Sequence, residues 1–174
     1  KDGKFHRINI KTKRIKEINF TAKVDLDVGP ELTFPYEIED DQIISRIIMD
    51  PVLSPDGKQL AFSTLTHLYL ADIETGEHKR ITKSNLGEFH PSWSPDSRSL
   101  VYVTWEANGG YIWKVKASGK NSPKKLTKTT AFYSHPVFTP DGKKIVALRG
   151  SAIDRLRSQS EFGGPTVPMD LISL

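Results

Sequence analysis

Three stretches of the sequence share one pattern: DPVLSPDGKQLAF at 50–62, HPSWSPDSRSLVY at 90–102 and HPVFTPDGKKIVA at 135–147. They align without gaps, and their starting positions place successive copies 40 and 45 residues apart. A period of this size corresponds to one four-stranded blade of a β-propeller. The repeat therefore predicts an all-β chain built from antiparallel blades.

Each copy holds a Ser-Pro-Asp or Thr-Pro-Asp turn between two short strands. Proline presets φ at the second turn position, aspartate bonds nearby backbone groups, and glycine tolerates positive φ. Gly57 and Gly142 follow the aspartate in two copies, whereas Ser97 does so in the middle copy. We therefore expect the middle turn to use a different residue at its fourth position. The turn aspartates are interpreted as turn formers and not as acid–base carboxylates: Asp56, Asp96 and Asp141.

A second hairpin follows each of the first two copies. LYLADIETGEHKRIT spans 68–82 and YIWKVKASGKNSPKKLT spans 111–127, each with a glycine in its turn. Both hairpins end in an apolar residue followed by threonine. Two hairpins per repeat predict a four-stranded antiparallel blade.

The two ends of the chain match only parts of the repeat. KFHRINIKTKRIKEINFT at 4–21 resembles the second hairpin alone, and PMDLISL at 168–174 resembles a third strand. The expected organisation is the outer half of a blade (1–21), an extended crossing segment (22–49), a full blade (50–83), another full blade (84–128) and a partial blade (129–174) with a long loop at 150–167. Propellers have about 4–8 blades, so we expect this partial propeller to be completed by oligomerisation or by missing sequence.

Composition sets outer limits on function. Hydrophobic residues make up 37% and charged residues 26% of 174 positions, as in a folded globular protein. The absence of cysteine excludes disulfides, thiolate metal sites and a cysteine nucleophile. No apolar run approaches the roughly 18 residues of a membrane span, and KDGKFHRINI has no signal-peptide core.

The densest basic stretch contains six lysines and no acid: Lys114, Lys116, Lys120, Lys124, Lys125 and Lys128. A nucleic-acid patch and a solvated edge hairpin are the two interpretations. Net charge is only +4, and the stretch lacks interleaved aromatic residues on which bases would stack. The edge hairpin is favoured, and we expect no nucleic-acid partner.

The motif Pro-x-Trp/Phe-Ser-Pro-Asp-Gly, with the Leu-Thr ending, resembles the TolB-type propeller repeat. That repeat occurs in periplasmic TolB, in tricorn-protease propellers and in prolyl oligopeptidase relatives. The order of segments from VDLDVGPELTFPYEI to SHPVFTPDGKKIVALRGS is similar to the propeller region of secreted bacterial amidohydrolase-fused proteins. The amidohydrolase His-x-His signature is missing from this chain. The resemblance implies a periplasmic or secreted protein and, as an alternative function, a metal-dependent hydrolase whose catalytic domain lies outside these residues.

Asp50, His90 and His135 occupy the same repeat position, before the proline of the innermost strand. Such residues cluster at one mouth of a propeller channel, where two imidazoles and a carboxylate could ligate a divalent metal. They are weak candidates, because each side chain could equally cap its own blade by bonding neighbouring backbone. Ser134 is expected to point away from His135, because adjacent strand residues face opposite sides.

Trp105 is the strongest candidate for contact with a ligand or partner. It lies with Glu106 and Asn108 in an expected irregular loop, TWEANGG, that ends in a flexible Gly-Gly pair. Arg149 and Arg155 border the long loop 150–167, which we expect at the same mouth because both loops join second to third strands. No nucleophile elbow or phosphate loop is present, and no cofactor is expected. The sequence thus favours a non-catalytic propeller segment that binds protein or peptide or gates a partner domain.

Overall fold

The computed structural model describes residues 4–26, 29, 44–157 and 167–174. The chain divides into two units, residues 1–42 and residues 43–174, and each is described by itself. Within the described ranges, no helix combines the length and the apolar character needed to cross a membrane.

The first unit contains a two-stranded hairpin of β1 (Phe5–Ile8) and β2 (Ile15–Ile18). Its turn is held by Asn9, whose side-chain oxygen accepts hydrogen bonds from the backbone amides of Lys11 and Thr12. All eight strand residues are exposed. Residues 30–43 of the expected crossing segment lie outside the described residues.

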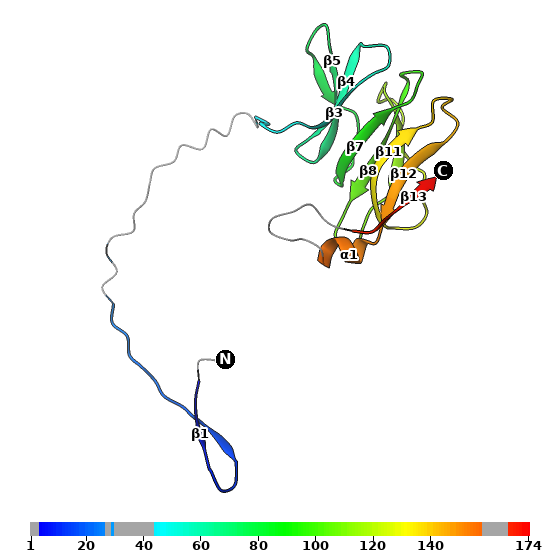
Figure 1. The fold of residues 1–174 in the computed structure, drawn as a ribbon. Coiled ribbons are helices and arrows are strands. Elements are labelled where there is room, and N and C mark those ends of the chain that lie inside the picture. The colour runs from blue at the N-terminus through cyan, green and yellow to red at the C-terminus, as the bar shows by residue number, and fades with distance from the viewer. Residues whose placement is uncertain (1–3, 27–28, 30–43, 158–166) are drawn as a thin grey trace. The chain divides into compact units, whose positions relative to one another are not determined.

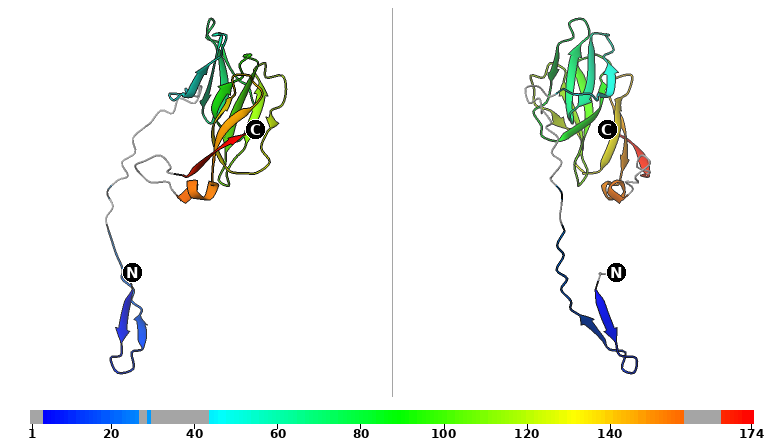
Figure 2. Two further views of the ribbon diagram at one scale, coloured as in Figure 1. Left: turned by 45° about the vertical axis from the view of Figure 1, so that its right-hand side comes forward. Right: turned by 90° about the vertical axis from the view of Figure 1, so that its left-hand side faces the viewer.

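The second unit contains three antiparallel sheets among its described residues (Figures 1 and 2). The first blade consists of β3 (Met49–Leu53), β4 (Gln59–Thr64), β5 (His67–Asp72) and β6 (His78–Arg80). The second blade consists of β7 (Gly87–Trp93), β8 (Ser99–Trp105), β9 (Ile112–Lys116) and β10 (Lys124–Lys125). The third blade consists of β11 (Phe132–Phe138), β12 (Ile145–Gly150) and β13 (Met169–Ser173). Strands pair in chain order within each blade, giving an unclosed propeller-like arrangement and confirming the predicted fold class.

The core lies between the blades. Strand β7 packs on β3, β4 and β5 on one side and on β11 on the other. We call the contact of the first and second blades the first junction. Its buried side chains are Ala61, Leu68, Leu70, Ile81, Trp93, Leu100, Tyr102, Val115 and Ala117. We call the contact of the second and third blades the second junction. Its buried side chains are Val103, Ile112, Ala131, Tyr133 and Ala147.

The three Pro-Asp turns share one geometry, and the middle copy uses Ser97 at the fourth position in place of glycine, as expected. Ser97 adopts φ 57°, the left-handed conformation that Gly57 and Gly142 adopt at 73° and 68°. Ser97 also accepts a hydrogen bond through its hydroxyl from the backbone amide of Asp56 in the first blade, at 3.1 Å. This bond across the first junction offsets part of the cost of positive φ in a residue with a side chain.

The stretch expected to be an irregular loop at 150–167 begins with a helix, α1 (Ala152–Arg157). Ser151 starts it, because its hydroxyl accepts a hydrogen bond from the backbone amide of Asp154 at 3.2 Å. Residues 158–166 lie outside the described ranges. Residues 44–48 lead into β3 without regular structure, and the carbonyl of Ile47 accepts a hydrogen bond from the Thr64 hydroxyl.

Candidate functional site

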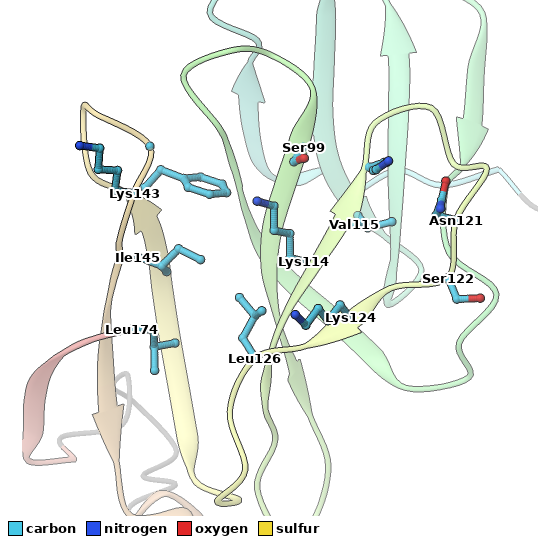
Figure 3. A pocket seen from close by; sticks show the side chains of 13 residues that line it. Ser99, Lys114, Val115, Asn121, Ser122, Lys124, Leu126, Lys143, Ile145 and Leu174 are labelled. Carbon is cyan, nitrogen blue, oxygen red and sulfur yellow. The ribbon is translucent and has the colours of Figure 1, made fainter.

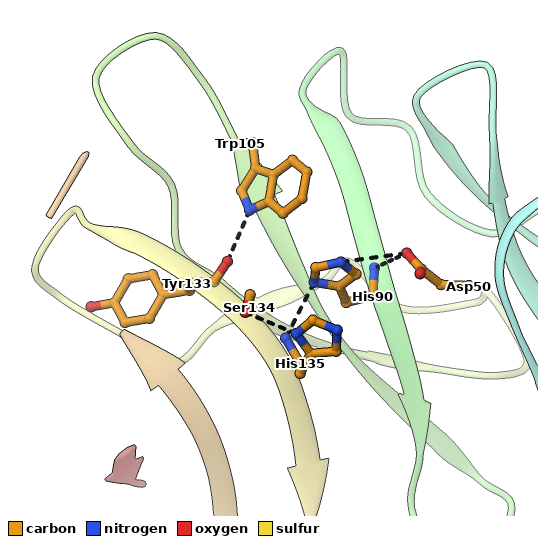
Figure 4. A network of polar contacts seen from close by, with 6 residues as sticks. All are labelled: Asp50, His90, Trp105, Tyr133, Ser134 and His135. Carbon is orange, nitrogen blue, oxygen red and sulfur yellow. Dashed lines mark hydrogen bonds and ion pairs between the residues drawn. The ribbon is translucent and has the colours of Figure 1, made fainter. Parts of the chain in front are cut away.

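Asp50, His90 and His135 lie in register at the innermost strands of the three blades (Figure 4). Each has positive φ, at 50°, 50° and 47°, and each sits where the pairing with the next strand slips at a β-bulge. Aspartate and histidine tolerate this conformation better than most residues with side chains. The bulge turns the Asp50 and His90 side chains toward the following blade.

These three residues form a polar relay between blades. The backbone amide of His90 donates to Asp50 Oδ2 at 3.2 Å, and the backbone amide of His135 donates to His90 Nδ1 at 3.2 Å. The rings of His90 and His135 stack with centroids 4.1 Å apart. The Asp50 and His90 side chains thus bond the next blade's backbone, and for these two residues the interpretation as caps of their own blade is corrected. The His135 side chain instead contacts Ser134 of its own blade.

The hydrogen bonds of the relay determine which ring nitrogen of His90 carries the proton. Because Nδ1 accepts from the His135 amide, the ring proton lies on Nε2, which is 3.7 Å from Asp50 Oδ2. Burial lowers the pKa of His90, and the Asp50 carboxylate opposes that shift. The described residues contain no group of three or more His, Asp or Glu arranged to hold a metal ion. The geometry therefore describes a structural relay that joins the blades.

Ser134 and His135 meet, contrary to the expectation from strand alternation. The Ser134 hydroxyl lies 2.9 Å from His135 Nδ1, because the bulge at His135 breaks the alternation of the strand. The contact uses Nδ1, and Ser134 is buried. Nothing in this pair resembles an exposed nucleophile beside a general base.

Trp105 is the final residue of β8 and is half-buried, where the sequence predicted an irregular loop. Its indole N–H donates to the Tyr133 carbonyl in the third blade at 2.8 Å. Its ring stacks on Phe89 with centroids 4.4 Å apart and meets the edge of His90 at 5.1 Å. Trp105 therefore packs the second junction beneath the relay, and its polar atom is already used inside the protein.

Helix α1 covers the outer side of this tryptophan. The Arg155 guanidinium carbon lies 4.6 Å from the centre of the Trp105 ring and 4.3 Å from that of Phe132. The predicted proximity of these two loops is thus correct. Glu106 and Leu156 line a cavity of about 20 Å³ here, which is far smaller than the several hundred Å³ of small-molecule pockets.

The other predicted site residues lie around this surface or apart from it. The Asn108 carbonyl accepts a hydrogen bond from the Thr130 hydroxyl at 3.1 Å. Arg149 lies in β12, where it pairs with Asp170 of β13 at 3.6 Å, and it does not line the cavity at Trp105. Gly110 is required by packing, because a Cβ there would lie 1.5 Å from the Thr104 carbonyl oxygen. The expected flexible glycine pair is therefore a tight turn.

The interpretation of the turn aspartates is confirmed by their bonds. The hydroxyls of Ser54, Ser94 and Thr139 each donate to the following turn aspartate at 2.6 Å. These hydroxyls, helped by backbone amides, lower the pKa of Asp56, Asp96 and Asp141.

Sequence reasoning missed a buried carboxylate, Glu88, in the first junction. Glu88 is fully buried in β7, and its Oε2 accepts from the Leu68 amide at 3.0 Å and the Thr82 hydroxyl at 2.5 Å. Its Oε1 has no hydrogen-bond partner among the described residues. Burial raises the pKa of Glu88, which the two hydrogen bonds and Arg80 oppose. The available signal was a glutamate two residues before His90, where the third copy has Tyr133.

The blades, their shared turn and the relay define a class of protein: an open segment of a β-propeller whose innermost strands are joined by hydrogen bonds between blades. Residues 41–156 match the family described as the TolB beta propeller domain, and the chain belongs to that family. The family resemblance noted in the sequence is thus confirmed, whereas its amidohydrolase-fused detail stays a prediction.

Solved structures show the same fold. A putative TolB from Agrobacterium tumefaciens is 23% identical, with a TM-score of 0.57 over 77% of this chain and 47% of that one. TolB from Acinetobacter baumannii is 25% identical, with a TM-score of 0.51 over 70% of this chain and 31% of that one. The uncharacterized peptidase YuxL of Bacillus subtilis is 35% identical over 68 residues, covering 36% of this chain and 10% of its own length. The chain thus spans less than half the length of these relatives.

Proposed function

We propose that the chain is a non-catalytic TolB-like propeller segment that binds protein or peptide, or gates a partner domain, through the surface around helix α1. The observation that carries this proposal is an exposed apolar pair on that helix. Ile153 and Leu156 are 59% and 53% exposed and lie three residues apart, on one face of the helix. Exposed apolar side chains grouped beside a loop surface mark interaction sites.

The surroundings of this pair suit a macromolecular partner. Leu156 borders the cavity at Trp105, with Glu106 and Arg155 beside it. The cavity is too small to enclose a metabolite, so a partner would lie across the surface. The stacking of Arg155 on Trp105 and Phe132 holds this surface in place.

Peptide selection followed by calorimetry tests the proposal. Peptides selected from a displayed library against the protein should lose most of their affinity for the double variant Ile153→Ser, Leu156→Ser. Ile73→Ser is the matched control, because Ile73 is also 53% exposed but lies in the first blade. Selected peptides that bind the double variant and the control equally well would reject this surface.

A second function follows from the similarity to YuxL, which is described as a peptidase. In this alternative the chain is the propeller part of a peptidase whose catalytic residues lie elsewhere in the gene product. The amidohydrolase-type hydrolase inferred from the sequence is the corresponding metal-dependent alternative. Peptidase and amidase assays on the full gene product, with and without a chelator, distinguish them. Chelator-sensitive amidase activity favours the amidohydrolase alternative, and chelator-resistant peptidase activity favours the peptidase.

We also propose that the propeller is completed by further blades, from a second copy or from additional sequence, in a periplasmic or secreted protein. Both terminal blades carry exposed apolar side chains, including Leu53 in β3 and Leu171 in β13. The hairpin β1–β2 would then serve as the outer half of a blade. Sedimentation should show association of this chain, and a compact, stable monomer would contradict the proposal.

A further inference from the structure

A groove of about 650 Å³ lies on the outer side of the second junction, away from helix α1 (Figure 3). Its apolar side chains include Leu126 from the second blade and Phe138 and Ile145 from the third. Four lysines line it as well: Lys114, Lys116, Lys124 and Lys143. The lining contains no aspartate or glutamate.

One repeat position at this groove holds lysine, whereas the equivalent position of the first blade holds leucine. Leu70 pairs with Ala61 in the first blade, and Lys114 pairs with Val101 at the equivalent position of the second. Leu70 is 2% exposed within the first junction. Lys114 is only half-buried, and its ammonium lies 5.2 Å from the centre of the Phe138 ring. A lysine keeps its charged end in water, so the second junction stays open here.

The lysines of this groove carry uncompensated charge. The ion pairs within the described ranges involve none of the four. Lys114 and Lys124 are direct cross-strand partners in β9 and β10, an arrangement in which like charges destabilise a sheet. Lys143 lines the opposite wall, and its ammonium points away from the groove (Figure 3). A bound anion would relieve the repulsion between Lys114 and Lys124.

We propose that this groove binds an extended acidic peptide segment of a partner protein, with carboxylates on the lysines and apolar side chains on Leu126, Phe138 and Ile145. The apolar lining favours a peptide, because sites for single-stranded nucleic acid use exposed aromatic faces on which bases stack. Phe138 already has Lys114 over its ring. The site is separate from the surface around helix α1 and goes beyond the function proposed above.

Fluorescence anisotropy with a labelled peptide, Glu-Leu-Glu-Glu-Leu-Glu, tests the proposal on the whole chain. Binding is expected to weaken about tenfold or more in the double variant Lys114→Gln, Lys124→Gln. It should also weaken at high salt, as expected for screened charge pairs. The peptide with glutamine in place of glutamate should bind at least about tenfold more weakly. Lys79→Gln is the matched control, because Lys79 holds the position of Lys124 in the first blade, and it should leave binding unchanged.

Circular dichroism of each variant separates a lost site from lost folding. Equal binding of the acidic and glutamine peptides would overturn the proposal. Tighter, lysine-dependent binding of a thymidine oligonucleotide or of anionic lipid vesicles would overturn it in favour of those partners. Loss of acidic-peptide binding in the Ile153→Ser, Leu156→Ser variant would place the peptide on the helix surface and likewise contradict the groove.

Discussion

The two blade junctions are alike at the beginning of strands β5 and β9 and differ two residues further along these strands. In their inner halves, Leu68 and Ile112 hold equivalent positions and both are fully buried. Two residues further along the same strands, Leu70 continues the dry contact with the second blade, whereas Lys114 opens a groove toward the third. The difference teaches that the inner strands set the propeller geometry, while outer positions are open to change for binding.

The polar links of the two junctions differ in the same way. In the second blade, the backbone amide of Ile112 donates directly to the Thr127 hydroxyl at 3.0 Å. In the first blade, the equivalent amide of Leu68 donates to the Glu88 carboxylate, which also accepts from Thr82. In the first blade, a carboxyl group therefore accepts the backbone hydrogen bond that a neutral hydroxyl accepts in the second. The first junction should depend on pH through this residue.

Leu70→Lys is expected to have the largest effect, because it replaces a buried apolar side chain of the first junction with an ammonium group. The free energy of unfolding should fall by about 3–5 kcal/mol, as for an uncompensated buried charge. Denaturation by guanidinium, followed by tryptophan fluorescence, measures the change. A loss below about 1 kcal/mol would show that the first junction accommodates a lysine at this position as well as the second junction does.

Glu88→Ala is expected to cost about 2–3 kcal/mol, because it leaves the Leu68 amide and the Thr82 hydroxyl without an acceptor. Glu88→Gln retains an acceptor and removes the titration. Burial raises the pKa of Glu88 in the folded state, so its contribution is fully present below the unfolded pKa and is lost as pH rises through the folded pKa. Wild type should therefore gain stability relative to Glu88→Gln as pH falls from neutral toward 4.5. A pH-independent difference between the two proteins would contradict this role.

His90→Gln tests the relay, with an expected loss of about 1 kcal/mol at pH above 7. Burial lowers the pKa of His90 against the opposing Asp50 carboxylate, while His135 and Arg155 act with burial. The contribution of the neutral ring is therefore present above the unfolded pKa of 6.5 and is lost as pH falls through the folded pKa. Because glutamine does not titrate, the difference in the free energy of unfolding between wild type and His90→Gln should become smaller on acidification. A gap that widens would show that His90 is protonated in the folded protein.

The sequence predicted the blades well, because their signal is local. Proline, aspartate and glycine at fixed offsets determine each turn, and alternation places the strands. The use of Ser97 in the middle turn was expected, whereas its hydrogen bond to the amide of Asp56, 41 positions earlier, could not be predicted from the turn pattern. Helix α1 was missed because only Ser151 and one turn of residues indicate it.

The candidate site was predicted less well, because its geometry depends on contacts between blades. Equal spacing placed Asp50, His90 and His135 at one mouth, but the direction of their bonds follows from β-bulges that no residue pattern reveals. Trp105 was interpreted as a loop residue, whereas Tyr133 and Phe89 hold it in the second junction. The lysine stretch indicated an exposed edge, and only the packing of Phe138 against Lys114 shows that part of it faces a groove.

Lys114→Leu tests the account most directly, because it gives the second junction the residue that closes the first. The variant should gain about 1 kcal/mol in the free energy of unfolding, from new apolar contact with Phe138 and from the loss of repulsion with Lys124. Guanidinium denaturation of wild type and variant at neutral pH is the measurement. An unchanged or lower free energy of unfolding would contradict the claim that this one repeat position decides whether a junction is dry or open.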